Sequence, residues 1–416
     1  MKKNLFNIGT LLFAVIGLIF TSCGSDNDSP INPNPPKPEE TILKGKLTGP
    51  LTLKAGSTYS VVGGYEVEEG GVLTIEEGVT LVATRSIDGA PDYILVKQGG
   101  KIIANGTKDK PIVMTSNRQE PGAWGGVHIC GKAPINLLGG KGKSEIGDAT
   151  FGGNDPHDNS GSMKYVRLEY TGFAFSETKE SNGLTLYGVG DGTTLEYIQT
   201  YKGADDGFEW FGGTVNAKYL VSTASEDDSF DWTDGWVGKG QFWVAYQDQT
   251  APDNNGTANG DCLIEADNRE DNFANTPVSS PTLANLTLIG NSDTNKQKRG
   301  IRLRAGTNIK IYNTLVAGKE HSLTTATKET EDSFTNNKSI AEYIHASKIF
   351  VYEGGASLAL DTKEGNAINQ TLTFKNGYIG TVAGGKDLSA DPFFTKTDYK
   401  GAVQENNDWT AGWTRR

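Results

Sequence analysis

Short apolar runs of three to six residues recur along most of this chain, and Gly, Asn or Asp interrupts them. Two early examples are residues 70–78 and 99–106, which begin 29 positions apart. Runs of this length, bounded by turn-forming residues, predict short β-strands. Sustained helical periodicity is scarce, so the pattern favours an all-β protein.

One motif repeats closely in the middle of the chain. The sequence DDGFEW at residues 205–210 returns as DDSFDW at residues 227–232, an offset of 22 at every position. These segments contain Gly and aromatic residues rather than helix formers. A 22-residue period accommodates three short strands and three turns, which is one coil of a parallel β-helix. The repeat therefore predicts that Phe208 stacks on Phe230 in the next coil.

Eight further runs fit the same scheme of strands. They are residues 163–170, 183–187, 194–198, 215–222, 241–246, 283–289, 301–304 and 309–316. We predict one parallel β-helix over residues 42–385, with residues 386–416 as a cap over its C-terminal end. A short helical insertion is expected within residues 333–350, around residues 340–344.

The composition agrees with an all-β protein that has many turns. Gly contributes 53 of 416 residues, well above its usual share of about 7%, and glycine adopts the positive φ of tight turns without steric cost. Aromatic residues reach 9%, too many for a disordered chain. The formal charge of -12 disfavours binding to nucleic acid, whose phosphates would be repelled, and favours metal cations.

The N-terminus predicts export and a lipid anchor. Two lysines precede an apolar run at residues 5–20, which is shorter than a bilayer span and typical of a secretory signal. The small residues before Cys23 resemble a bacterial lipobox. We therefore expect a signal peptide at residues 1–22 and lipidation of Cys23. The alternative is an ordinary signal peptide followed by an incidental cysteine.

Residues 23–41 predict a tether between that anchor and the folded domain. The acidic stretch directly after Cys23 resembles the export signal of lipoproteins on the outer face of some outer membranes. Prolines at five positions of residues 30–38 favour a stiff polyproline spacer. We expect an outer-membrane protein, attached by lipid and facing the cell exterior. A plain solvated tether is the alternative for the acidic stretch.

Several segments together carry a family resemblance. Residues 73–80, 104–107, 111–116 and 124–127 resemble secreted right-handed parallel β-helix proteins. The tail at residues 391–414 is similar to the C-terminal end of β-helix surface lipoproteins of Gram-negative bacteria. The resemblance spans about residues 42–416. It implies a right-handed β-helix and a surface lipoprotein, and it implies no particular activity.

An acidic ladder is the strongest candidate for a metal site. The predicted Ca²⁺ ligands are Asp205, Asp206, Asp227 and Asp228. At an offset of one coil, Asp206 stacks on Asp228 about 4.8 Å away. Like charges at that distance repel unless a cation intervenes, and Ca²⁺ prefers six to eight oxygen ligands. The alternative is a turn ladder in which the Asp side chains accept backbone hydrogen bonds. Residues 154–159 and 261–271 are weaker oxygen-rich candidates.

Strand alternation separates the aromatic residues into two groups. Phe208 and Trp210 share one strand face and Glu209 takes the other. Because burial of an unpaired Glu is costly, the aromatic face is expected to point inward. Trp236 and Trp243 lie outside the strict repeat, so we interpret them as candidates for a flat sugar-binding platform.

Signals for catalysis are weak, and we assign no catalytic residue. Parallel β-helices, the fold that the resemblance implies, host pectin-type lyases and polygalacturonase-like hydrolases. Residues 205–206 followed by residues 302–304 are faintly similar to the hydrolase order, but its Gly-His-Gly element is missing. The four histidines form no zinc spacing. Fold alone does not license an activity.

After lipidation of Cys23, two cysteines remain, Cys130 and Cys262. They could pair in an exported protein, or each could be a buried thiol in a strand. The unpaired state is favoured, because each lies at the edge of an apolar run.

Two functional hypotheses follow from the sequence. In the first, the chain is a non-catalytic surface lipoprotein whose β-helix face binds a glycan, a protein or an outer-membrane uptake complex. In the second, it is a Ca²⁺-dependent polysaccharide lyase or glycoside hydrolase. A cleft with a carboxylate pair and an available Arg or Lys would favour the enzyme.

Overall fold

The computed structural model describes residues 41–84, 89–176, 179–249, 260–292, 299–353 and 359–416. The described residues from 41 onward form one compact unit. The predicted signal peptide, Cys23 and nearly all of the predicted tether lie outside the described residues. Among the residues described, no helix combines the length and the apolar character needed to cross a membrane.

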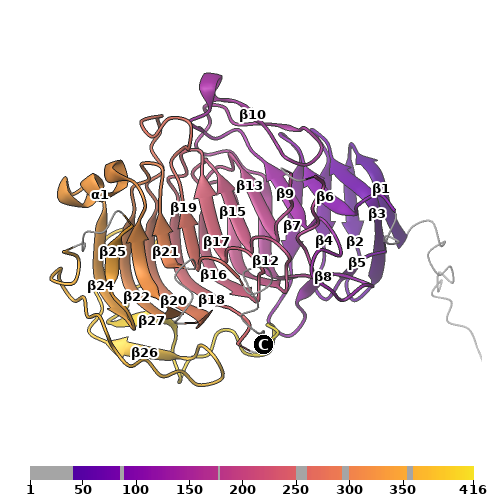
Figure 1. Cartoon of the computed structure of the whole chain (residues 1–416). Coiled ribbons are helices and arrows are strands. Elements are labelled where there is room, and N and C mark those ends of the chain that lie inside the picture. The colour runs from indigo at the N-terminus through magenta and orange to yellow at the C-terminus, as the bar shows by residue number, and fades with distance from the viewer. Residues whose placement is uncertain (1–40, 85–88, 177–178, 250–259, 293–298, 354–358) are drawn as a thin grey trace, which may run out of the picture. The chain divides into compact units, whose positions relative to one another are not determined.

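The coils form three parallel β-sheets, which we call sheets I, II and III (Figure 1). Sheet I contains β6 (Tyr93–Val96), β9 (Val127–Cys130), β13 (Leu184–Tyr187), β15 (Phe208–Phe211), β17 (Phe230–Thr233), β19 (Ile264–Ala266), β21 (Arg299–Leu303), β23 (His321–Thr325) and β25 (Phe350–Tyr352). In the first coils, sheet II contains β2 (Pro50–Leu53), β4 (Val72–Ile75) and β7 (Lys101–Asn105), and sheet III contains β5 (Thr80–Ala83) and β8 (Ile112–Ser116).

Longer strands take part in two sheets at once. From the fourth coil onward, each long strand pairs in sheet II with its first half and in sheet III with its second half. These strands are β12 (Gly161–Glu169), β14 (Thr194–Tyr201), β16 (Asn216–Thr223), β18 (Lys239–Tyr246), β20 (Thr282–Ser292), β22 (Lys310–Lys319) and β24 (Ile340–Ala346). β1 (Ile42–Leu47) and β3 (Thr58–Val67) join sheets III and I in the same way. The predicted right-handed parallel β-helix is confirmed.

The 22-residue repeat is the register of two neighbouring coils. Phe208 pairs with Phe230, and Trp210 pairs with Trp232. All four aromatic side chains are fully buried, whereas Glu209, between them, faces outward and is half-buried. The prediction that the aromatic face of this strand points into the core and Glu209 points outward is therefore confirmed.

Each long strand bends between sheets II and III at one residue with a left-handed backbone. These residues are Tyr165, Tyr197, Tyr219, Phe242, Asn285, Asn313 and Tyr343, with φ between 50° and 62°. Asn tolerates this conformation, but aromatic residues rarely adopt it. The aromatic rings stack on one another, with centroids 4.4 Å apart for Tyr165 and Tyr197 and 4.2 Å apart for Tyr197 and Tyr219. This stacking offsets part of the backbone strain.

The helix lies elsewhere than predicted. α1 covers Lys328–Thr335, and the segment predicted to be helical is strand β24. β24 pairs with β22 in sheets II and III and bends at Tyr343, one of the left-handed residues at the corner between these two sheets. The register of the neighbouring coil thus overrides the local helical pattern of residues 340–344, since tertiary pairing outweighs weak intrinsic propensity.

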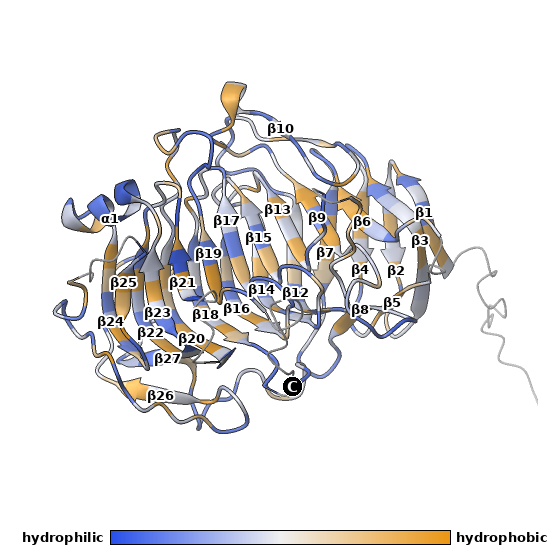
Figure 2. Ribbon diagram, in the orientation of Figure 1, coloured by the Kyte–Doolittle hydropathy of each residue, from blue (hydrophilic) through white to orange (hydrophobic). Residues whose placement is uncertain are grey.

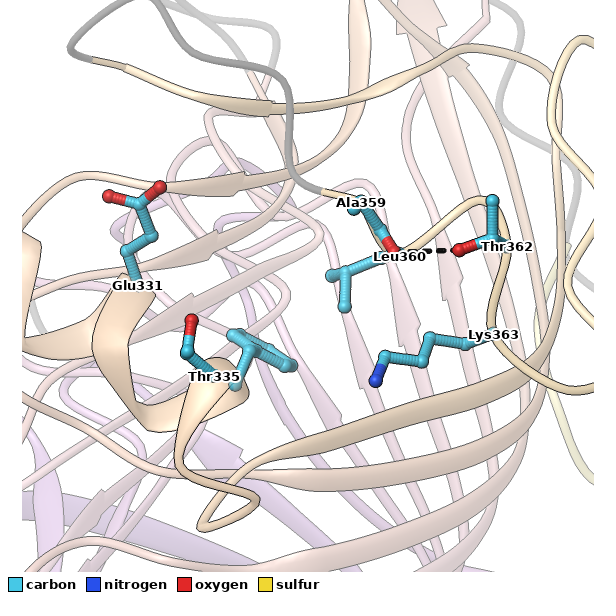
Figure 3. Close-up of a pocket in the computed structure, with 7 residues that line it drawn as sticks. Glu331, Thr335, Ala359, Leu360, Thr362 and Lys363 are labelled. Carbon is cyan, nitrogen blue, oxygen red and sulfur yellow. Dashed lines mark hydrogen bonds between the residues drawn. The ribbon is translucent and has the colours of Figure 1, made fainter.

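Residues 359–370 cover the last coil. Ile344 donates its N–H to Asn366 Oδ1 at 2.8 Å, and Ala346 donates to the Ala367 carbonyl at 2.8 Å. Leu360 is buried in the main core. A cavity of about 530 Å³ opens beside it, with α1 on one side and Lys363 on the other (Figure 3).

The predicted C-terminal cap, residues 386–416, is corrected by the structure. This segment lies along the corner between sheets II and III. Gln241 binds both backbone groups of Thr395, at 2.8 and 2.9 Å, and Asn313 binds both backbone groups of Lys386, at 2.7 and 2.8 Å. Outward-facing amides of several coils therefore hold the segment to the side of the β-helix.

Residues 374–409, which begin before this segment and overlap it, cover the outer face of sheet III. Val221 and Val244 of this face form a buried cluster with Tyr378 and Val403. Within the covering segment, β26 (Gly380–Ala383) pairs antiparallel with β27 (Tyr399–Val403). The apolar side chains on the outer face of sheet III are thus shielded from solvent.

We expect Phe230→Ala to lower the free energy of unfolding by about 3–5 kcal/mol, because removal of a buried Phe leaves a cavity. The ring of Phe230 is fully buried and lies 5.4 Å from Phe208 and 4.8 Å from Trp243. Denaturant titration measures the loss. The control is Leu138→Ala, since Leu138 is 99% exposed and should change stability by less than about 0.5 kcal/mol. A loss under about 1 kcal/mol for Phe230→Ala would contradict the stacked core.

Candidate functional site

Sheet I presents a row of outward-facing polar residues in strict register. Thr185, Glu209, Asp231, Glu265 and Arg302 pair in sequence from β13 to β21. Their neighbours along each strand point into the core, as strand alternation requires. Hydrophilic positions therefore cross β15, β17 and β19 (Figure 2). Because neighbouring strands lie about 4.8 Å apart, the three carboxylates of this row are close neighbours.

The turns that lead into sheet I add a second set of carboxylates. Asp206 accepts a hydrogen bond from the backbone N–H of Asp228 at 2.9 Å. Asp228 in turn accepts one from the backbone N–H of Cys262 in the following coil. The predicted turn ladder is therefore present, with each Asp holding the backbone of the next coil.

These carboxylates form four overlapping groups in which the ligand atoms lie within 4.8 Å of one another. The groups are Asp206–Glu209–Asp231, Asp205–Asp206–Asp227, Asp227–Asp228–Asp261 and Asp228–Cys262–Glu265. Three of them contain only oxygen donors, which suits Ca²⁺. We call the eight acidic residues of all four groups the acidic track.

The four predicted metal ligands thus lie together, but in different pairs from those expected. Asp206 and Asp228 belong to separate groups rather than to one bridged pair. The four predicted ligands did not include Glu209 or Asp231, and Glu265 was included only within the weaker candidate segment, residues 261–271. Their outward position on sheet I was the available signal, because it places them beside the aspartates of the turns.

Burial and mutual repulsion raise the pKa of several carboxyl groups in the track. Asp206 and Asp228 are almost fully buried, and burial followed by nearby carboxylates holds both pKa values well above their ordinary range. Burial, with the charges of Glu180 and Asp227, raises the pKa of Asp205 to about 8. A divalent cation would relieve this repulsion by favouring the charged carboxylates.

Arginines border the C-terminal side of the track, and each is paired. Arg302 contacts Glu265 at 3.0 Å and Glu353 at 3.2 Å. Arg304 contacts Glu265 and Asp267, both at 2.8 Å. Although burial opposes the charge, the neighbouring carboxylates keep the pKa values of both guanidinium groups above the ordinary value. Neither arginine is poised to lose a proton as a catalytic base.

A long loop, residues 131–160, covers the N-terminal side of the track. The loop contains a 3₁₀ turn at Leu138–Gly140, β10 (Gly142–Lys143) and β11 (Thr150–Phe151), and it packs on the outer face of sheet I (Figure 1).

Tyr187 lies beneath this loop and donates its hydroxyl to Glu145 at 3.1 Å. Burial raises the pKa of Glu145 to about 7, and the hydrogen bond with Tyr187 opposes that rise. The loop thus adds a further carboxyl group beside the track.

His128, which shares the outward row, is not available for acid–base chemistry. It is fully buried, and its Nε2 lies 2.6 Å from the Gly125 carbonyl oxygen. Burial lowers its pKa to about 4.

The predicted sugar platform is wrong. Trp236 and Trp243 are both fully buried, and their ring centroids lie 4.8 and 5.1 Å from that of Trp210. Their indole N–H groups donate to the carbonyls of Val215 and Ala217, both at 3.1 Å. Trp243 takes the inward position that Leu220 has in the preceding coil, and Trp236 lies in the turn between β17 and β18. Cys130 and Cys262 are buried and unpaired, as favoured.

The fold and this site define a parallel β-helix with a carboxylate-rich outer face. The chain belongs to the family described as the pectate-lyase like beta helix domain, whose family model matches residues 45–414. Neither the search of curated proteins nor the search of solved structures gave a significant match.

In the presence of a chelator, we expect the free energy of unfolding to rise as the pH is lowered from about 8 to about 5. A carboxyl group whose pKa is higher in the folded than in the unfolded state stabilises the fold below its unfolded pKa, and this contribution is lost as the pH rises through the folded pKa. Asp205, with a pKa of about 8, and Glu145, with a pKa of about 7, set this window. Denaturant titrations across the range measure the slope.

The matched control is the double variant Asp205→Asn/Glu145→Gln, which removes two of the titrating groups and should reduce the slope, while Asp206 and Asp228, whose pKa values are also raised, keep the rest of it. Stability that instead increases with pH in wild-type protein would contradict the raised pKa values.

Proposed function

We propose that the protein binds divalent cations, Ca²⁺ foremost, along the acidic track and uses this face of sheet I to bind a partner at the cell surface. The observation that carries the proposal is the overlap of four donor groups, which gather eight carboxylates across neighbouring coils. Such a concentration of negative charge is unfavourable in a partly buried site without counter-ions. Three groups offer only oxygen ligands, the donors that Ca²⁺ prefers.

A binding role is favoured over catalysis by the surroundings of the track. The nearest arginines are held by carboxylates at 2.8–3.2 Å, so they are unsuited to act as a base in an elimination reaction. No residue of the acidic track lines the cavity beside Leu360 or the cavity bordered by Tyr201 and Tyr246. A bound cation on an open face suits recognition of an extended partner, such as a glycan or an uptake protein of the outer membrane.

A Ca²⁺-dependent polysaccharide lyase or glycoside hydrolase is the second candidate. The family description supports it, and a carboxyl group that stays protonated near neutral pH, as Asp205 would, can serve as a general acid. The test incubates the protein with acidic and neutral polysaccharides in Ca²⁺. New reducing ends or unsaturated products that disappear in Asp205→Asn would support the enzyme, and their absence from wild type would support binding alone.

We also propose that Cys23 carries the lipid that holds the protein in the outer membrane. The lipobox-like residues before Cys23 and the proline-rich stretch after it support this attachment. The β-helix itself supplies no apolar helix among its described residues that could replace the anchor.

We expect Ca²⁺ to raise the melting temperature of the wild-type protein by a few degrees. Ligand at 100 times its dissociation constant adds about 2.7 kcal/mol, which is a small shift for a chain of this length. Mg²⁺ should help less, since it requires a tighter octahedral shell and releases water reluctantly. Thermal scans in chelator, Ca²⁺ and Mg²⁺ measure the effect, and identical scans in chelator and Ca²⁺ would sink the proposal.

The matched variant is Asp206→Asn/Asp228→Asn. Asn keeps the oxygen that accepts the amide N–H groups of Asp228 and Cys262, but it removes both charges. The double variant should therefore melt no lower than wild type in chelator and should lose the Ca²⁺ shift. Asp109→Asn, at an exposed residue, should keep it. A shift that survives in the double variant would place the cation elsewhere.

We expect Cys23→Ala to abolish fatty-acid labelling and to remove the protein from the outer-membrane fraction. The reason is that the thioether of this cysteine would be the attachment point of the lipid. Labelling and membrane fractionation measure the two effects. Cys130→Ala, which changes a buried cysteine of the β-helix, is the control and should keep the label. A Cys23→Ala protein that remains labelled in the outer membrane would refute the anchor.

A further inference from the structure

The cavity beside Leu360 lies at the C-terminal end of the β-helix and has a volume of about 530 Å³. The residues of its lining that matter here are Glu331, Phe334, Ala359, Leu360 and Lys363. Pockets that bind small organic molecules have volumes of about 300–1,000 Å³. This cavity is therefore large enough for an organic ligand rather than for a single ion.

Two separately anchored walls form the cavity (Figure 3). One wall is α1, which is fixed to the turn after β21 because the hydroxyl of Thr330 accepts the N–H of Gly306 at 3.0 Å. The other wall is residues 359–363. Asn366 holds this segment by donating to the carbonyl of Leu360 at 2.6 Å and to a carbonyl of β24 at 2.8 Å. Each wall is thus fixed to the end of the β-helix by contacts of its own.

The apolar part of the lining comes from Phe334, Ala359 and Leu360. Phe334 and Leu360 are anchored in the main hydrophobic core, and Ala359 is exposed. A ligand that places an apolar side chain against these residues removes apolar surface from water, which favours binding.

The two walls carry opposite charges. Glu331 belongs to α1, and the side chain of Lys363 is directed toward α1 from the opposite wall (Figure 3). In the described part of the chain, neither residue forms an ion pair, and Lys328 of α1 pairs with Asp332 at 2.6 Å.

The dipole of α1 adds to the charge of its wall. The helix ends at the cavity, and no basic residue occupies its last turn. The negative end of its dipole is therefore not compensated by a side chain of the helix. The α1 wall favours a cationic group of a ligand, and the opposite wall favours an anionic group.

This arrangement selects the class of ligand. A free amino acid carries its ammonium and carboxylate groups on one carbon atom, whereas the charges of the cavity belong to separate walls. An extended dipeptide separates its two termini by about 7 Å, since each residue adds about 3.3–3.6 Å. Its side chains can also supply the apolar groups that the lining favours.

We infer that this cavity binds a short peptide with free termini and apolar side chains, with its ammonium group at Glu331 and its carboxylate at Lys363. The site shares no residue with the acidic track, and the inference does not rest on Ca²⁺ binding. It gives the C-terminal end of the β-helix a ligand chemistry of its own.

The test measures binding of dileucine to the full chain by calorimetry in the presence of a chelator. The reference ligands are N-acetyl-dileucine, which lacks the ammonium group, and dileucine amide, which lacks the carboxylate. Wild-type protein should bind dileucine at least about tenfold more tightly than either reference ligand, because each of them loses one charge-assisted hydrogen bond.

The matched variants exchange the charges of the two walls. Glu331→Lys and Lys363→Glu each place like charges on both walls, so each should weaken dileucine binding at least about tenfold. The double variant Glu331→Lys/Lys363→Glu restores opposite charges and should bind dileucine at least about fivefold more tightly than either single variant. Glu329→Lys, at an exposed residue of α1 outside the lining, should keep wild-type affinity. Melting scans verify the fold of each variant.

Three outcomes would overturn the inference. Wild-type protein that does not bind dileucine would exclude the site. Dileucine amide that binds as tightly as dileucine would show attraction of the ammonium group to the acidic track instead. A double variant that binds no better than the single variants would show that the two charges do not act on one ligand.

Discussion

Register between coils is the constraint on which the rest of the structure depends. Every side chain has the residue at the same position in the next coil as its neighbour, about 4.8 Å away. In the core this brings like residues together: Phe208 stacks on Phe230, and Trp210 is in register with Trp232. No coil can bury its inward face alone, so stability accumulates from contacts between neighbours. The same rule operates at the corner, where stacked tyrosines hold a backbone conformation that a single tyrosine would rarely adopt.

Where the residues in register are charged, the same constraint places like charges side by side, and they repel one another. Glu209, Asp231 and Glu265 occupy one outward row, and register prevents them from moving apart. At the C-terminal side of this row, Arg302 and Arg304 form ion pairs with Glu265. Asp206 and Asp228 accept hydrogen bonds from backbone amides of the next coil. Those hydrogen bonds satisfy only part of each carboxylate. The remaining oxygens converge in groups of three, and this excess of acceptors over donors makes the track a candidate cation site.

Much of the fold was predictable because the repeat is visible in the chain. The 22-residue offset predicted the register, and alternation predicted which face of β15 points inward. The helix was misplaced because residues 340–344 look helical alone, whereas pairing with β22 makes them a strand. Trp243 was misassigned because it lies 23 rather than 22 residues after its register partner Leu220, which hides its inward position. The position of residues 386–416 depends on amides such as Asn313, and no local pattern reveals such distant partners. At the site, the aspartates were predictable, but their grouping with Glu209 and Asp231 required the three-dimensional arrangement of turn and strand.

The acidic track and the cavity on sheet III have opposite causes in the stacking of the coils. At the acidic track, the row is continuous and equal charges accumulate, so bound cations would relieve their repulsion. On the outer face of sheet III, the row Tyr201–Thr223–Tyr246 is interrupted by one short side chain, which leaves a cavity beside it. Repetition of an acidic position therefore concentrates charge, whereas a change of side-chain size between consecutive coils opens space. Both conditions occur here within the coils from β14 to β19, because neighbouring coils agree in charge on one face and differ in size on another.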